Sequence, residues 1–239
     1  MIEALGWGAL AASSLVIGAI LGTVRSWSPQ LIGLVLAFGA GALISAVSFD
    51  LAQEGAAVGG TGYVGLGLAA GAVTYFALNR VVARRGRRGN DGSADEDSGS
   101  ALALGAFLDG IPEQIVLGIA IAVGDGVSVG LLVAIFVSNL PEAIGSSTEM
   151  RAAGTRVAAV RRLWILVALI CTSATVAGYA IADSVSGNLN ATIDGFAAGA
   201  LLVMLIDSMI PDAVRKGGDR AGLVTVLGFA VAAALSSLS

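Results

Sequence analysis

Two short stretches of the chain place acids and prolines inside runs that are otherwise apolar. The first reads Phe-Leu-Asp-Gly-Ile-Pro-Glu-Gln over residues 107–114, and the second reads Val-Ser-Asn-Leu-Pro-Glu-Ala over residues 137–143. A charged side chain in a membrane-spanning helix costs at least roughly 2.5–3.5 kcal/mol at the bilayer centre, so such groups usually face a path for ions or water. We therefore expect the two stretches to line such a path.

Helical spacing gathers the polar side chains of each stretch on one face. Residues three or four apart are neighbours on a helix, which brings Asp109 together with Glu113, and Ser138 and Asn139 together with Glu142. Two glutamates close together in a low dielectric cannot both be ionised unless a cation or a proton lies between them. The spacing therefore predicts a divalent-cation site at which protons compete.

A proline in each stretch adds a backbone ligand. Pro112 and Pro141 have no backbone N–H, which frees the carbonyls of Leu108 and Val137, four residues earlier. Carboxylate, amide, hydroxyl and carbonyl oxygens at one depth are the ligands that hard cations take.

The composition indicates that both stretches belong to a polytopic membrane protein. Of 239 residues, 56% are hydrophobic and only 13% are charged, where a soluble domain carries nearer a quarter of charged residues. The chain has one cysteine, Cys171, and no histidine, which excludes disulfides within the chain, Cys-rich zinc sites and Ser/His or Cys/His catalysis. We interpret Cys171 as a small buried apolar residue.

The elements that position the two stretches are predicted to be membrane-spanning helices. Eight apolar runs are long enough to cross a bilayer: 4–24, 30–53, 59–82, 101–123, 127–148, 162–182, 192–211 and 221–238. We expect one transmembrane domain over residues 1–239. The polar segment 84–100 is expected to be a disordered cytoplasmic loop within it.

The basic residues test this count of spans. All 13 of them follow odd-numbered spans or end one, at Arg25, Arg80, Arg84, Arg85, Arg87, Arg88, Arg151, Arg156, Arg161, Arg162, Arg215, Lys216 and Arg220. Cytoplasmic loops carry an excess of Lys and Arg. The pattern predicts eight spans with both termini outside.

Two of the spans resemble each other in sequence. Phe-Gly-Ala-Gly-Ala-Leu-Ile at 38–44 matches Phe-Ala-Ala-Gly-Ala-Leu-Leu at 196–202, although the two spans run in opposite directions. Inverted repeats of this kind are common in secondary transporters. The alternative is chance similarity between two helices rich in Ala, Gly and Leu.

Four acids in or beside these matched spans are candidates for the ends of an ion pathway. Asp50 and Glu54 are interpreted as an entrance, and Asp207 and Asp212 as an exit. The alternative for Glu54 and Asp212 is that they are ordinary interfacial charges.

Paired Pro-Glu motifs in adjacent spans, eight spans, a polar loop after the third span and termini outside together resemble the ZIP family of divalent-metal transporters. The resemblance implies inward transport of zinc, iron, manganese or cadmium in the cell membrane. It also implies a 3+2+3 helix arrangement with an inverted repeat, and a homodimer. We expect lipid and metal ions as partners, and no nucleic acid.

The chain departs from the family pattern at several ligands. The family's fourth-span motif is typically His-Asn-x-Pro-Glu-Gly, whereas this chain has Asp109 and Gly110 before Pro112 and Glu113. The fifth span keeps its glutamate, and the sixth has no acid. An oxygen-only site favours manganese, magnesium or ferrous iron over zinc. We predict one ion, with ligands drawn from Asp109, Glu113, Gln114, Ser138, Asn139 and Glu142.

Two competing interpretations stay open at this stage. One is a ZIP-fold protein that has lost metal transport and acts as a binding module or carries another solute. Independently of this choice, the alternative for Ser138 and Asn139 is that they only bond helices together. The other is an intramembrane enzyme, which we do not expect, because the Gly-Asp-Gly sequence around Asp125 is an ordinary turn signal.

Overall fold

The computed structural model describes residues 1–88, 110–111, 113–122, 129–183 and 187–237, and these are helical apart from short connections. The helices are α1 (Ile2–Val24), α2 (Pro29–Ala46), the π-helical η1 (Val47–Gln53), α3 (Glu54–Gly59), α4 (Thr61–Arg88), the Glu113–Ala122 helix, α6 (Val129–Ala152), α7 (Val157–Asp183), α8 (Gly187–Met204), the π-helical η2 (Leu205–Met209), α9 (Ile210–Gly217), the short 3₁₀ turn η3 (Gly218–Arg220) and α10 (Ala221–Ser236).

The helices follow the apolar runs, and their ends follow local backbone chemistry. Pro29 occupies the first turn of α2, and the Ser28 hydroxyl caps that helix by accepting from the Leu31 amide at 3.2 Å, as expected for this pair of residues. Gly60 and Gly218 adopt positive φ where the chain turns into α4 and towards α10, a conformation that glycine takes without a Cβ clash. The segment from α8 to α10 is therefore two helical runs joined by a turn.

Six described segments are long and apolar enough to cross a membrane, by length and composition. Large apolar side chains remain exposed on their outer faces, among them Leu66 of α4, Leu169 of α7 and Leu223 of α10. Apolar surface of this extent is typical of contact with lipid. The architecture is that of a multi-pass membrane protein.

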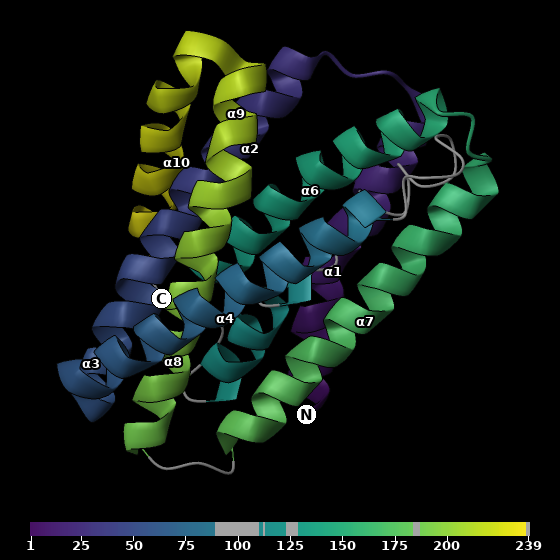
Figure 1. The fold of residues 1–239 in the computed structure, drawn as a ribbon. Helices are drawn as coiled ribbons and strands as arrows, with labels where there is room; N and C mark the ends of the chain where they lie inside the picture. The colour runs from purple at the N-terminus through teal and green to yellow at the C-terminus, as the bar shows by residue number, and fades with distance from the viewer. Residues whose placement is uncertain (89–109, 112, 123–128, 184–186, 238–239) are drawn as a thin grey trace.

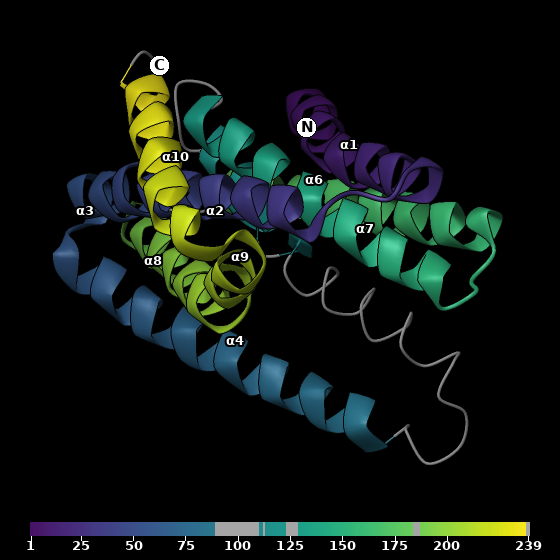
Figure 2. The same cartoon turned by 90° about the horizontal axis from the view of Figure 1, so that it is seen from above.

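The helices lie in three groups. Figure 2 shows α4, α8 with α9, and α10 on one side, α1 and α7 on the other, and α2 and α6 between them. Figure 1 shows that α2 and α8 run in opposite directions, so that α3 and α9 lie at opposite ends of the bundle. α6 thus occupies the middle of the bundle.

Side-chain contacts bring several connecting segments that carry basic residues to the same end of the helix bundle. The Arg161 guanidinium donates to Thr23 at the end of α1 at 3.2 Å, and Lys216 of α9 approaches the Glu149 carboxylate of α6 at 4.0 Å.

α4 continues to Arg88, so residues 84–88 are helical where the sequence analysis expected a loop from residue 84. Arginine favours helix. Residues 89–109 lie outside the described residues.

The two similar spans pack in equivalent ways. A Cβ added to Gly41 of α2 would collide with a backbone carbonyl of α10, and one added to Gly199 of α8 would collide with a backbone carbonyl of α4. The same holds from the other side of each contact. A Cβ added to Gly228 of α10 would collide with the carbonyl of Phe38, and one added to Gly71 of α4 would collide with that of Phe196. Matched residues therefore make matched close approaches between helices, which supports a repeat over chance similarity.

Both matched spans also contain a π-helical segment at the same position. The π-helical segments begin at Val47 and Leu205, each nine residues after the matched phenylalanine. Asp50 and Asp207 lie within these segments. A single π-turn inside an α-helix often marks a functional position, and the sequence analysis did not predict either one.

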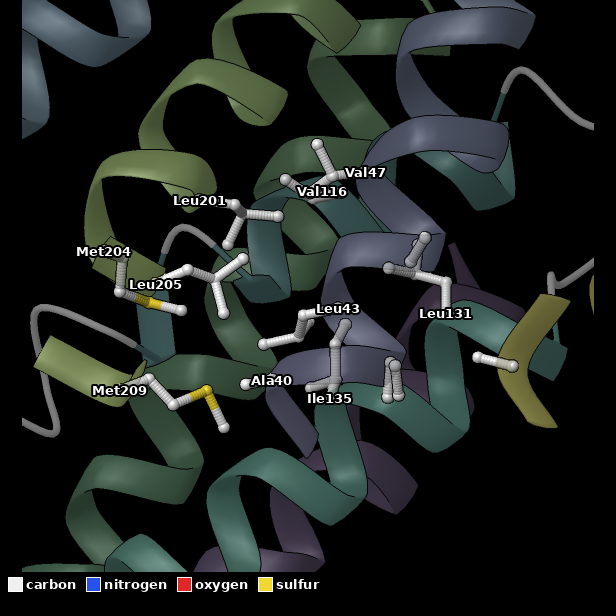
Figure 3. Close-up of a cluster of buried hydrophobic side chains, with 14 of the residues drawn as sticks. Ala40, Leu43, Val47, Val116, Leu131, Ile135, Leu201, Met204, Leu205 and Met209 are labelled. Atoms are coloured by element: carbon white, nitrogen blue, oxygen red, sulfur yellow. The ribbon is translucent and has the colours of Figure 1, made fainter. Parts of the chain in front are cut away.

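A core of buried apolar side chains fills the bundle where α2, the Glu113–Ala122 helix, α6 and α8 meet (Figure 3). Leu43, Val116, Ile135 and Leu201 contribute to it and are at most 1% exposed. A second cluster joins α1, α6 and α7 around Trp164. These two clusters fix the faces that α6 and the Glu113–Ala122 helix present to each other.

Candidate metal centre

Glu113 is the centre of a hydrogen-bonded group that joins two helices. The residue is 2% exposed, and its carboxylate accepts from two α6 side chains, the Asn139 amide at 2.7 Å to Oε2 and the Ser138 hydroxyl at 3.3 Å to Oε1. Both donors also bond the carbonyl of Ile135 within α6. The structure therefore brings Glu113 together with Ser138 and Asn139 of the facing helix α6.

The direction of these bonds decides what the α6 side chains contribute. Asn139 Nδ2 is a donor and cannot bind a cation, which leaves Oδ1 as its ligand atom. Hydrogen bonds to an ionised carboxylate are worth about 1.5–3 kcal/mol. In this state Ser138 and Asn139 hold the Glu113 carboxylate in one orientation, which agrees with their helix-joining interpretation and keeps Asn139 Oδ1 as a candidate ligand.

α6 is held against α1 by direct backbone packing. A Cβ at Gly18 would lie 2.6 Å from the Leu140 carbonyl oxygen, and one at Gly22 would lie 2.5 Å from that of Ile144. The Thr148 hydroxyl also lies 3.4 Å from the carbonyl of Gly22. Close approach of this kind gives a rigid support for side chains on the opposite face of α6.

Gln114 points towards α7 and is fully buried. Its Oε1 accepts from the Thr175 hydroxyl at 2.5 Å, whereas its Nε2 has no hydrogen-bond partner. The predicted ligand Gln114 therefore uses its oxygen to tie its own helix to α7. A buried donor without a partner lowers the free energy of unfolding by about 1–3 kcal/mol, so Gln114 destabilises the fold at this position.

Cys171 of α7 belongs to this group, and the sequence analysis missed it. The thiol is fully buried. A Cβ added to Gly110 would lie 3.1 Å from this sulfur and 3.9 Å from Asn139 Oδ1. The carboxylates of Glu113 and Glu142 both act on it electrostatically. The available signal was that the chain's single cysteine lies in the same sixth span as Thr175.

The remaining predicted ligands are placed only in part. Glu142 is half-buried on α6 and shares the electrostatic environment of Cys171 with Glu113. Asp109 and Pro112 lie outside the described residues. Within the described part of the chain, no three carboxylate or thiol groups gather closely enough to hold a metal ion, so amide or hydroxyl oxygens would have to complete a site there.

The four predicted pathway acids have different surroundings. The half-buried Asp50 accepts from the Ser236 hydroxyl of α10 at 3.2 Å, and Asp207 is exposed. Asp212 pairs within α9 with Arg215 at 2.7 Å and Lys216 at 3.3 Å. These ion pairs favour the interfacial interpretation for Asp212, because neighbouring basic residues already balance its charge.

Glu54 is exposed and begins α3, which lies at the opposite end of the bundle from the α9 helix that carries Asp212 (Figure 1). Beside it, the buried Asp194 of α8 lies against the backbone of Gly55 and interacts electrostatically with Glu54. Asp194 was not among the site residues predicted from the sequence. Its burial follows from the close packing of α8 on α3.

Comparison with known proteins gives one informative similarity. No family model matches the chain. The chain is 30% identical over 192 residues to an Arabidopsis thaliana protein named "Putative zinc transporter". The alignment covers 79% of this chain and 31% of that protein, so the chain spans less than a third of its relative's length. This similarity supports a relationship with the ZIP family.

Proposed function

We propose that the chain carries a divalent metal cation across a membrane, through a site between the Glu113–Ala122 helix and α6. The observation that carries this proposal is the buried Glu113 carboxylate, oriented by Asn139 and Ser138 from the facing helix. Glu142 and Cys171 add ionisable groups to the same environment. Several acidic ligand groups in a low dielectric are stabilised by a cation among them.

The class of metal follows from the donor atoms. Carboxylate and amide oxygens alone would favour manganese or ferrous iron, whereas a thiolate beside them also suits zinc. Because the Cys171 thiol and Asn139 Oδ1 both lie near Gly110, and Cys171 is within electrostatic range of both glutamates, we propose zinc as a substrate alongside manganese and ferrous iron. The name of the Arabidopsis relative supports zinc.

We further propose eight spans with both termini outside the cell membrane. The basic connections that meet at one end of the bundle, including Arg161 and Lys216, are expected at the cytoplasmic face. On this orientation α3 and the start of α8 face outwards, and α9 faces the cytoplasm.

Uptake measurements test the proposed function. Glu113→Gln and Glu142→Gln keep the shape of each side chain and remove its charge, so we expect each to abolish zinc or manganese accumulation in cells that lack their own importer. Glu3→Gln, an exposed acid in the first turn of α1, is the matched control and should accumulate metal like the unmodified chain.

Expression at the membrane is measured for all four proteins. Equal uptake by the unmodified chain and both central variants would refute transport through this site. A chain that binds metal but moves none would instead support the alternative of a binding module.

A further inference from the structure

Five arginines lie where α1 ends and where α6 turns into α7. They are Arg25 after α1, Arg151 and Arg156 around the turn between α6 and α7, and Arg161 and Arg162 near the start of α7. The Arg161 guanidinium donates through Nε to Thr23 Oγ1 at 3.2 Å, which joins the two segments directly. Figures 1 and 2 show both segments at the same end of the bundle.

The charge of these five arginines is not balanced by acids of the described residues. The ion pairs in that part of the chain join Asp212 and Glu149 to Arg215 and Lys216, and none includes one of the five. Four of the five side chains are exposed, and Arg161 is half-buried. Like charges gathered on one surface raise the local positive potential, which attracts an anion.

Arg161 is held in one orientation with part of its guanidinium unused. Its Nε is bonded to Thr23, whose own hydroxyl donates to the carbonyl of Ile20 at 2.9 Å. The two terminal nitrogens of the guanidinium make no hydrogen bond or ion pair with the residues that the structure describes. A planar guanidinium with free N–H groups matches the paired oxygens of a phosphate group.

An exposed apolar surface continues from these arginines along α7. Ile165, Leu166 and Leu169 are exposed and follow Arg162 by three, four and seven residues, so they share its face of the helix. On the α1 side, the Arg25 guanidinium lies over the Trp27 ring, 5.6 Å from its centroid, and tryptophan is typical of the membrane–water interface. Positive charge at the interface beside an apolar surface matches a lipid with an anionic headgroup.

We propose that Arg25, Arg161 and Arg162 bind the phosphate headgroup of an anionic phospholipid, whose acyl chains lie along the exposed apolar face of α7. Arg151 and Arg156 add positive charge at the same surface. The inference goes beyond the proposed function, because it requires only that the chain lies in a membrane. On the proposed orientation the site faces the cytoplasmic leaflet, where anionic lipids attract basic segments.

The test titrates the purified, delipidated full-length chain in detergent with phosphatidylglycerol or phosphatidylcholine. Native mass spectrometry gives the ratio of lipid-bound to lipid-free chain, and hence the affinity of the first lipid. We expect phosphatidylglycerol to bind at least about tenfold more tightly than phosphatidylcholine, and Arg161→Gln and Arg162→Gln each to reduce that preference about fivefold. Arg215→Gln is the matched control and should keep the preference, because Asp212 already balances this arginine at the same end of the bundle.

The outcomes separate a lipid site from general attraction between charges. Equal affinity for the two lipids, or an equal loss of preference in Arg162→Gln and Arg215→Gln, would overturn the inference. Displacement of phosphatidylglycerol by an equal concentration of inorganic phosphate would also overturn it, because a free anion would then suffice. Arg162→Gln changes an exposed side chain and gives the answer even if Arg161→Gln fails to fold. Its loss of preference would support the lipid site even if Glu113→Gln had no effect on uptake.

Discussion

Replacing Asn139 by aspartate turns the strongest contact of the central group into a repulsion. The Asn139 amide donates to Glu113 at 2.7 Å in a buried setting. Two unit charges at that separation repel by about 6 kcal/mol at an effective dielectric constant of about 20, and by about 4 kcal/mol if the side chains relax to about 4 Å. Protonation of one of the two carboxyls would limit this cost at neutral pH, so Asn139→Asp should lower the stability of the metal-free chain by up to about 4 kcal/mol.

The change is large enough for a thermal-shift assay on purified protein. For a chain of this size each kcal/mol shifts the unfolding temperature by about 2–4 °C, so we expect a fall of up to about 8–16 °C in chelator. A divalent ion placed between the two carboxylates would remove the repulsion. Saturating Zn²⁺ or Mn²⁺ should therefore raise the unfolding temperature of Asn139→Asp by more than that of the unmodified chain.

Asn139→Leu is the matched control, because it removes the same hydrogen bond without adding charge. It should lose only about 1.5–3 kcal/mol in chelator, and added metal should not restore the loss preferentially. The reasoning would be refuted if Asn139→Asp were as stable as the unmodified chain in chelator. It would also fail if metal stabilised Asn139→Asp and Asn139→Leu equally, because the added carboxylate would then not face an ion.

Two further substitutions test the donor set and the helix packing. Cys171→Ser replaces sulfur by oxygen beside the two glutamates, so we expect its zinc affinity relative to manganese to fall about tenfold, or about 1.4 kcal/mol. A competition titration measures this ratio, and an unchanged ratio would exclude the thiol as a ligand. Gly199→Val would force α8 away from α4 and should cost at least about 1–3 kcal/mol. Gly6→Ala, which has nothing within 4 Å, should unfold like the unmodified chain, and equal unfolding temperatures for both variants would contradict the packing.

Only part of the buried polar group around Glu113 could be predicted along the chain. Glu113, Ser138 and Asn139 were recognised because acids and amides stand out in apolar runs, and helical spacing fixes which of them share a face. Whether Asn139 offers its oxygen or its nitrogen to the site depends on what the facing helix presents. The sequence analysis interpreted Asn139 as a ligand or a helix-joining residue, and the structure gives its amide nitrogen the second role.

The sequence by itself predicted that the chain forms long apolar helices and that its basic residues lie in the connections between them, because hydrophobicity and charge along a chain are local properties that determine which segments enter a bilayer. It also revealed the likeness between residues 38–44 and 196–202. Only the tertiary structure decided that Cys171 of α7 lies within electrostatic range of Glu113 and Glu142, and that Asp194 of α8 is buried against Gly55 of α3. The rotation of one helix against another depends on the close packing of glycines and core side chains from distant segments, and a single helix's own pattern does not contain that information.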